Sequence, residues 1–226
     1  MTEEAPLHNW MIEEREYLRQ ESRRGKRHAF NHLDPARTAL AVIDMVPFFA
    51  DLDYVRGIVP NIMRIADALR AAGGTVAWVL PGKVGGGPSG TFAEFYGPRT
   101  AELFRSSGGT GPLRERVIPE LTVRDEDLLV EKSTASAFFP GGCPLAEQLR
   151  ERNVETVLIT GTVANVCCES SARDASTRGF RTIMVADGNA AVRDQDLNAT
   201  LHTIYRSFGD VRPTAEVLQL IAAEAR

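Results

Sequence analysis

The hydrophobic positions of this chain form two alternating patterns, which are short continuous apolar runs and longer stretches with helical spacing. A continuous run is typical of a strand that is buried on both faces of a parallel sheet. We therefore interpret the runs as strands of one such sheet. They fall at residues 40–43, 75–80, 128–130, 154–160 and 181–186, and a short sixth strand is expected near 210–212.

Between these runs, apolar residues recur three and four positions apart, as on the buried face of a helix. Ile58, Ile62 and Ile65 show this spacing, and Gly73 with Gly74 ends that helix. Strands that alternate with helices predict an α/β fold with a mostly parallel central sheet that helices cover on both faces. Further helices are predicted at residues 144–152, 165–178 and 197–208, and from residue 214 onwards.

The N-terminal segment departs from this alternation. Residues 10–27 are highly charged, with Trp10 and Leu18 among the charges, and they predict a helix in an arm that spans 1–36. Two interpretations stay open for this arm, a solvated surface face and a contact with a neighbouring subunit. The remaining residues, 37–226, have the length of a single compact domain.

A second departure is the glycine-rich insertion at residues 82–113. It contains Gly85-Gly86-Gly87-Pro88, followed by Phe92, Phe95 and Tyr96. Long insertions inside a compact domain often form lids, whose glycines permit movement while aromatic side chains cover a substrate. An ordinary surface loop is the equally weighted alternative.

Composition narrows the possible partners and compartment. The chain has 226 residues, 43% of them hydrophobic, and a formal net charge of −4, which argues against nucleic acid or an anionic membrane as a partner. Three cysteines do not suggest a disulfide framework and favour a reducing compartment. Neither a membrane-spanning run nor a signal peptide is evident, so a soluble cytoplasmic protein is expected.

The segment Gly161–Ala175 carries the clearest chemical signal. It places Cys167 between a predicted strand and a predicted helix, where unpaired N–H groups and the helix dipole favour a thiolate. This position is expected to lower the thiol pKa and to offer donors to an oxyanion. Cys167 is therefore a candidate nucleophile.

Two further polar residues follow predicted strands, and parallel strands bring their carboxyl ends to one edge of the sheet. Asp44 directly follows the first apolar run, and Lys132 follows the third. Taken singly, Asp44 suits a turn or cap, Lys132 a surface charge and Cys167 a small buried residue. Together they fit a nucleophilic triad, in which Asp44 takes the thiol proton and Lys132 stabilises both anions.

From about Thr38 onwards, the chain resembles the isochorismatase-like cysteine hydrolase family. Three segments carry the resemblance in the family's order: Val42–Met45, Lys132–Phe139 and Gly161–Ala175. The resemblance implies a three-layer α/β/α sandwich of Rossmann-like type. It also implies a catalytic triad of Asp44, Lys132 and Cys167, and a homodimer or homotetramer.

The resemblance also assigns the neighbours of the thiol. Counted back from Asp174, the family's nucleophile falls on Cys167, and Cys168 takes a place usually held by valine, which suggests a core residue. The family has a cis peptide that maps to Thr162–Val163, and it would direct the N–H of Val163 towards that of Cys167 to form an oxyanion hole. Asn165 is expected to be a cap or structural residue.

Two departures from the family's pattern affect the site. Val46 stands where the family usually has glutamine, so a polar contact near the site is expected to be absent. Nicotinamidase-type relatives carry a metal site after the second strand, but this region reads Leu80-Pro81-Gly82-Lys83 here. We therefore expect no metal and no other cofactor, and nicotinamidase is disfavoured. The chain's histidines, which lack ligand spacing, are His8, His28, His32 and His202.

Aromatic residues near the proposed triad are candidates for substrate binding. Phe48, Phe49 and Phe138 flank it in sequence, and Phe95 with Tyr96 lies in the insertion. They could wall an apolar pocket, although aromatic residues at strand ends are as often ordinary core. The stretch Phe95-Tyr96-Gly97-Pro98 is similar to a short segment of isochorismate-cleaving members.

Three functions follow from these observations. The first is a cysteine amidohydrolase that cleaves a C–N bond of a small amide or ureido compound through a thioester. The second is an isochorismatase, which hydrolyses a vinyl ether and releases pyruvate with Asp44 as proton donor and no nucleophile. The third is a non-enzymatic thiol sensor based on Cys167 and Cys168, which leaves Asp44 and Lys132 unexplained.

Overall fold

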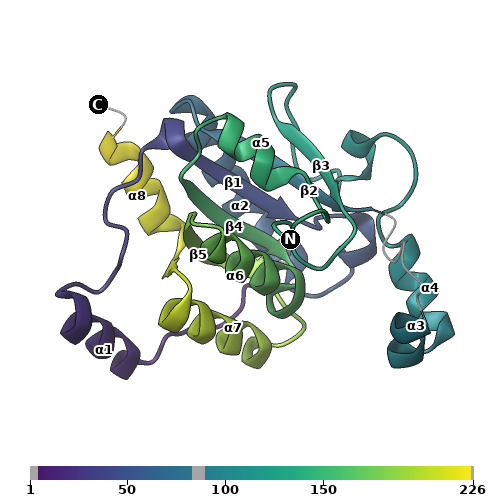
Figure 1. The fold of residues 1–226 in the computed structure, drawn as a ribbon, viewed down its shortest axis with the longest axis horizontal. Helices are drawn as coiled ribbons and strands as arrows, with labels where there is room; N and C mark the ends of the chain where they lie inside the picture. Colours follow the sequence, from purple (N-terminus) through teal and green to yellow (C-terminus); the bar gives the residue numbers. More distant parts are fainter. Residues whose placement is uncertain (1–4, 83–89, 225–226) are drawn as a thin grey trace.

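A single sheet forms the centre of the computed structural model, which describes residues 5–82 and 90–224 (Figure 1). The six strands lie in the order β3-β2-β1-β4-β5-β6, and every neighbouring pair is parallel, as the sequence predicted. The strands are β1 (Thr38–Ile43), β2 (Thr75–Pro81), β3 (Leu128–Lys132), β4 (Thr156–Thr162), β5 (Arg181–Ala190) and β6 (Asp210–Arg212).

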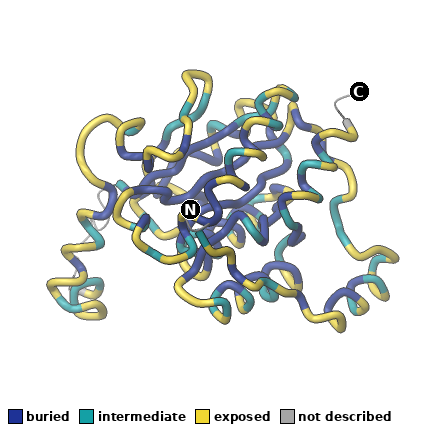
Figure 2. Tube along the Cα trace, turned by 180° about the vertical axis from the view of Figure 1, so that it is seen from behind, coloured by how far each residue is buried: buried dark blue, intermediate teal, exposed yellow. Residues whose placement is uncertain are grey.

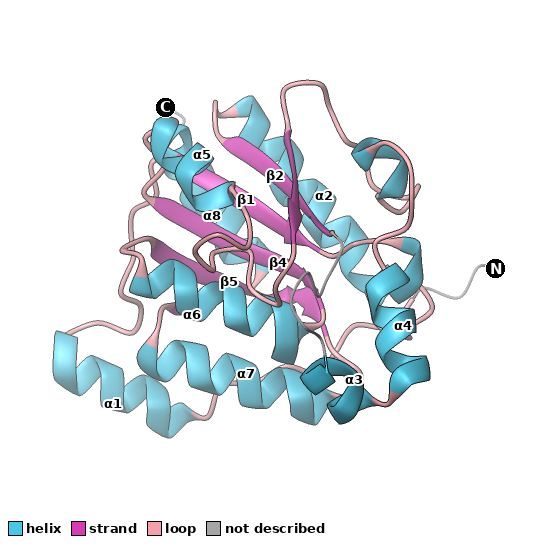
Figure 3. Cartoon of the chain, turned by 45° about the vertical axis from the view of Figure 1, so that its right-hand side comes forward, coloured by secondary structure: helices cyan, strands magenta, loops and turns pink. Residues whose placement is uncertain are grey.

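Helices cover both faces of this sheet (Figures 1 and 3). Because alternate residues of a strand point to opposite faces, β1 divides its side chains between two cores. Ala41 and Ile43 pack in the core under α5, α6 and α7, whereas Leu40 and Val42 pack under α2 and α8. The predicted three-layer α/β/α fold is confirmed. The helices are α2 (Val55–Ala71), α5 (Leu145–Glu151), α6 (Glu169–Thr177), α7 (Asp194–Ser207) and α8 (Thr214–Glu224).

The predicted helix of the N-terminal arm is present as α1 (Glu14–Arg24), and it packs against α7 of its own chain. Gln20 donates hydrogen bonds from Nε2 to the carbonyls of Tyr205 and Arg206, at 3.4 and 3.2 Å. Tyr17 and Gln20 are buried, whereas Glu14, Arg15 and Arg23 are exposed, so the helix has one solvated face and one face that packs on its own chain. Its contact with a neighbouring subunit stays a prediction.

The insertion after β2 contains two short helices, α3 (Gly90–Tyr96) and α4 (Pro98–Ser106). Gly97 joins them with a φ of 79°, a conformation that favours glycine. This segment is therefore not the irregular loop that its glycines suggested. Gly85, Gly86, Gly87 and Pro88 lie outside the described residues.

The distribution of burial follows the layers. In Figure 2 the strands at the centre are buried, while exposed residues gather on the connecting loops and on the outer turns of the helices. Among the helices in residues 5–82 and 90–224, none is long and apolar enough to cross a membrane.

Candidate active site

The candidate site lies where the strand order reverses. The chain runs from β1 outwards to β2 and β3 on one side, and from β4 to β5 and β6 on the other. In open parallel sheets, the crevice beyond the carboxyl ends of the strands at such a point is the usual place for a ligand. Asp44 follows β1, Lys132 ends β3 and Cys167 follows β4, so the structure brings the three predicted residues together.

Asp44 is held by an unusual backbone conformation. Its φ is +51°, in the left-handed region that aspartate tolerates better than most residues. Its N–H donates to the Val79 carbonyl at 2.9 Å, which continues the contact between β1 and β2 beyond the end of β1. The side chain is only 1% exposed, so its carboxylate lies almost wholly out of water.

Lys132 connects the other two members of the site. Its Nζ lies 2.8 Å from Asp44 Oδ2 and donates to the Thr134 carbonyl at 3.2 Å and to Cys167 Sγ at 3.5 Å. A lysine ammonium has three hydrogens, and these three partners occupy them. Lys132 is 3% exposed, so the burial of its charge is balanced by Asp44 in direct contact.

Cys167 lies in the turn that joins β4 to α6. The turn, η4 (Ala164–Cys168), is π-helical, a form that is rare and frequent at functional sites. The peptide bond between Thr162 and Val163 is cis, as the family resemblance implied. The N–H groups of Val166 and Cys168 both donate to the Val163 carbonyl, at 3.0 and 3.3 Å, which fixes the turn around the thiol.

Burial controls the ionisation of the site. The pKa of the Cys167 thiol is raised to about 12, first by burial and then by the Asp44 carboxylate, against the opposing effect of Lys132. Burial also raises the pKa of Asp44, although Lys132 opposes the shift. For Lys132, burial lowers the pKa, but the charge interactions and hydrogen bonds with Asp44 and Cys167 outweigh it and the pKa is raised.

These shifts correct the expectation that the helix start lowers the pKa of Cys167. The thiol is therefore protonated at neutral pH, because it is largely withdrawn from water beside a carboxylate, although Cys167 is only partly buried and lines the cavity. Asp44 Oδ1 is buried and has no hydrogen-bond partner among the described residues. That oxygen is therefore free to accept a proton.

The three residues line a cavity of about 200 Å³. Its walls come from the ends of the strands, from η2 (Pro47–Phe49) and from the helices α3 and α4. Four aromatic residues line it, namely Phe49, Phe92, Tyr96 and Phe104. Val163, whose N–H belongs to the predicted oxyanion hole, also lines it.

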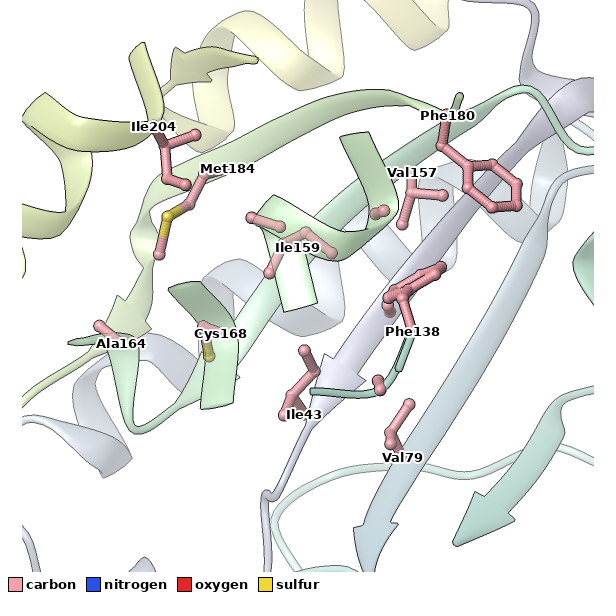
Figure 4. Packing of buried hydrophobic residues seen from close by; sticks show 14 of the residues in the cluster. Ile43, Val79, Phe138, Val157, Ile159, Ala164, Cys168, Phe180, Met184 and Ile204 are labelled. Carbon is pink, nitrogen blue, oxygen red and sulfur yellow. The ribbon is translucent and has the colours of Figure 1, made fainter. Parts of the chain in front are cut away.

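Two of the five predicted substrate-binding residues line the cavity, and the other three are not among its lining residues. Phe49 and Tyr96 line the cavity. Phe138 has no exposed surface and packs against Phe180 with ring centroids 5.6 Å apart, so it is a core residue (Figure 4). Phe95 is not among the lining residues and is 79% exposed.

Phe48 also differs from the prediction. It is exposed and stands beside the cavity walls, with its ring centroid 4.9 Å from that of Phe49 and 6.0 Å from that of Phe104. Sequence reasoning did not assign Phe92 and Phe104 to the site. The spacing of Phe92 and Tyr96, four residues apart, could have indicated one face of a helix in the insertion.

Two sequence neighbours of Cys167, Cys168 and Asn165, lie in different environments. Cys168 has no exposed surface and packs in the core, where Figure 4 shows it near Ile159, so the prediction of a core residue is confirmed. Asn165 is exposed and lies inside η4, whose N-cap is Val163, so of the two expected roles it is a residue of the turn and not its cap.

The described residues hold no group of three or more histidine, cysteine, aspartate or glutamate side chains placed to bind a metal ion. His8, for example, lies in the arm, where its Nδ1 contacts Asp194 Oδ1 at 2.6 Å. The sequence-based expectation of a site without a metal stays a prediction.

Comparison with known proteins defines the family. The model of the isochorismatase domain matches residues 38–216, which include Asp44, Lys132 and Cys167. The chain therefore belongs to the isochorismatase family and is a hydrolase.

Individual relatives agree with this assignment. The chain is 31% identical over 191 residues to the uncharacterized isochorismatase family protein YwoC of Bacillus subtilis, covering 84% of this chain and 97% of the relative. It is 31% identical over 221 residues to the ureidoacrylate amidohydrolase RutB of Methylobacterium radiotolerans, covering 86% of this chain and 83% of the relative. A crystal structure of a cysteine hydrolase from Pseudomonas syringae matches with a TM-score of 0.73 and 29% identity, over 99% and 100% of the two chains.

Proposed function

We propose that this hydrolase cleaves a C–N bond of a small amide or ureido compound, with Cys167 as nucleophile, Asp44 as base and Lys132 as the cation that holds both. One observation carries the proposal, the contact of the Lys132 ammonium with Asp44 at 2.8 Å and with Cys167 Sγ at 3.5 Å. The similarity to an amidohydrolase and to a cysteine hydrolase supports it.

In the first half of the reaction, the sulfur of Cys167 attacks the carbonyl carbon while the thiol proton passes to Asp44. The buried, unpartnered Oδ1 of Asp44 suits this transfer. The N–H groups of Val163 and Cys167 would stabilise the negative oxygen of the tetrahedral intermediate. The C–N bond then breaks, and Asp44 returns the proton to the leaving ammonia or amine, which leaves a thioester from an amide or the corresponding thiocarbamate from a ureido compound.

In the second half, Asp44 takes a proton from a water molecule, and the oxygen attacks the thioester carbon. The C–S bond breaks, the acid product leaves, and the sulfur recovers a proton from Asp44. Because Asp44 begins and ends the cycle as a carboxylate, the reaction needs no further proton carrier. Lys132 keeps its charge throughout, since its pKa is raised.

Isochorismatase activity is the alternative, and one observation favours it. Burial raises the pKa of Asp44, which is what a proton donor to a vinyl ether needs. This reaction would not require the thiol. The thiol-sensor hypothesis loses ground because Cys168 is completely buried in the core.

Ammonia release from a panel of small amides and ureido compounds tests the proposal. Wild type should release ammonia, and Cys167→Ala should not. Cys168→Val is the matched control, since it replaces a buried thiol with an apolar side chain of similar size, and it should keep most of the activity. The alternative would replace the proposal under two conditions. Wild type would release no ammonia from any compound of the panel, and both wild type and Cys167→Ala would release pyruvate from isochorismate.

A further inference from the structure

The charges around the cavity balance each other. Among the described residues that line it, Asp44 and Lys132 are the ones with charged side chains. They form an ion pair at 2.8 Å, and both are buried. A substrate that carried its own charge would therefore need another partner in the wall.

Lys132 cannot bind a charged group of the substrate without losing its present contacts. The Asp44 carboxylate, the Thr134 carbonyl and the Cys167 sulfur already occupy its three hydrogens. Turning the ammonium towards a substrate carboxylate would leave the buried Asp44 without its cation, which is costly.

Two arginines of this region, Arg105 and Arg116, are also engaged, and a third, Arg99 of α4, is exposed and is not among the lining residues. Arg105 pairs with Glu102 at 3.3 Å, and its guanidinium carbon lies 5.9 Å from the centre of the Phe92 ring. Arg116 is buried, where it donates to the carbonyls of Gly108 and Pro81 and pairs with Glu131. Neither arginine belongs to the cavity lining.

The part of the wall that α3 and α4 supply is aromatic instead. The ring of Tyr96 lies 4.8 Å from that of Phe92 and 5.1 Å from that of Phe104, measured between centroids. Phe48 joins Phe104 to Phe49, so the cluster continues from the insertion to the segment after β1. Such rings favour flat or alkyl groups, and they offer an anion nothing to replace its water.

Building on the proposed function, we propose that the group beyond the scissile carbonyl of the substrate is uncharged and apolar, either alkyl or aryl. The enzyme would then act on neutral amides or ureides and discriminate against compounds with a carboxylate in that place. Ureidoacrylate, after which the Methylobacterium radiotolerans relative is named, carries such a carboxylate.

Two isosteric pairs of amides test this inference. In each pair an isopropyl group replaces a carboxylate of similar size: 4-methylpentanamide against succinamate, and 4-isopropylbenzamide against 4-carbamoylbenzoate. We expect kcat/KM to be at least about 100-fold higher for the neutral member of at least one pair, because an unpaired carboxylate would be desolvated. Equal or faster hydrolysis of the acids, lost in Cys167→Ala, would overturn the inference while leaving the proposed function intact.

Aldehydes give a second readout that does not depend on turnover. The thiol of Cys167 adds to an aldehyde carbon, forming a C–S bond, while its proton passes to the aldehyde oxygen. We expect 4-isopropylbenzaldehyde to bind at least about 30-fold more tightly than 4-carboxybenzaldehyde in calorimetric titration, with Cys167→Ala as the blank. If no amide is hydrolysed, the proposed function fails, whereas this pair still decides the inference. Equal binding would overturn it.

Two neighbouring residues of α4 allow a matched substitution. Phe104 lines the cavity, whereas Leu103 is half exposed and does not. Phe104→Arg should shift the ratio of acid to neutral kcat/KM towards the acids by about tenfold or more, and Leu103→Arg should leave it unchanged. Phe92→Arg repeats the test if Phe104→Arg fails to fold by circular dichroism. An unchanged ratio in a folded Phe104→Arg or Phe92→Arg would contradict the inference.

Discussion

The Lys132 ammonium lies 2.8 Å from the Asp44 carboxylate, although β1 and β3, whose ends these residues mark, are separated by β2. The ion pair thus spans the carboxyl end of β2, the strand between them. In the structure they form a buried pair, in which the loss of either partner leaves the other without compensation.

Removal of Lys132 should therefore affect both activity and stability. We expect Lys132→Met to lower kcat/KM by about 10²–10⁴-fold, because Asp44 would lose the cation that keeps it ionised. The free energy of unfolding should fall by about 3 kcal/mol at pH 8, as is typical when a buried ion pair is broken. Urea unfolding measures this loss.

The pH dependence of that loss has a definite sign. Without Lys132, the pKa of Asp44 should rise further above its ordinary value, because burial already raises it and Lys132 opposes the rise. A carboxylate with a raised pKa in the folded state destabilises that state as the pH rises through this range. Lys132→Met should thus be less impaired at pH 5 than at pH 8, and Asp44→Asn combined with Lys132→Met should recover part of the stability. A loss independent of pH would contradict this account.

The activity of the wild type should have an acid limb set by Asp44. As the proposed base, Asp44 must be ionised, and burial raises its pKa above that of an ordinary aspartate. We expect kcat/KM to fall as the pH drops through this raised pKa, which places the midpoint of the limb above about 3.9. A profile of kcat/KM against pH checks this, and a rise with a midpoint near 8.5 would instead indicate direct ionisation of an ordinary thiol.

Cys167 should react slowly with alkylating agents in the unliganded protein. A thiol with a pKa of about 12 is ionised to about one part in 10⁴ at pH 8, far less than a free cysteine. The rate of iodoacetamide labelling, followed by mass spectrometry, should keep rising up to pH 10 without a plateau. Asp44→Asn should accelerate labelling at pH 8, because it removes the carboxylate that disfavours the thiolate.

Phe138 and Phe139 should differ in their contributions to the free energy of unfolding. Phe138 is fully buried, and Phe138→Ala should cost about 3–5 kcal/mol of unfolding free energy through the cavity it leaves. Phe139 is 51% exposed, so Phe139→Ala should cost well under 1 kcal/mol. Thermal or urea unfolding compares the two variants, and equal losses would mean that Phe138 is not a core residue.

The arm should contribute to stability through His8. This residue is buried, with Nδ1 2.6 Å from Asp194 Oδ1, and its Nε2 accepts from the Ala191 N–H at 3.0 Å. Its ring also stacks on that of Tyr54, with the two ring centroids 3.7 Å apart. His8→Ala should lower the unfolding free energy by about 2 kcal/mol, because it leaves a buried N–H without a partner. Leu7→Ala, at a half-exposed neighbour, should change it by less than about 0.5 kcal/mol.

The strands and the three central site residues could be predicted from the sequence because their signals are local. An apolar run identifies a buried strand, and a polar residue at its end falls at the edge where all parallel strands finish. Asp44, Lys132 and Cys167 each follow such a run directly or after one turn. Their meeting therefore needs only the parallel order of the strands.

Other features depend on packing that the sequence does not display. Phe138 and Phe139 are adjacent, and only the fold decides that one enters the core while the other faces solvent. The raised pKa of Cys167 comes from burial by several elements, which outweighs the helix start. The helices α3 and α4 were missed because the glycines and prolines around them suggest a loop.

The positions of α3 and α4 have a consequence for how this protein could change. Most of the aromatic wall is encoded by one short stretch, residues 90–106, whereas the residues proposed to react lie at or just beyond the ends of three strands. Selectivity could thus be altered by exchanging a single cassette while the reaction chemistry is inherited intact. The residues that contact the variable part of the substrate and the residues proposed to react are thus encoded in separate segments of the chain.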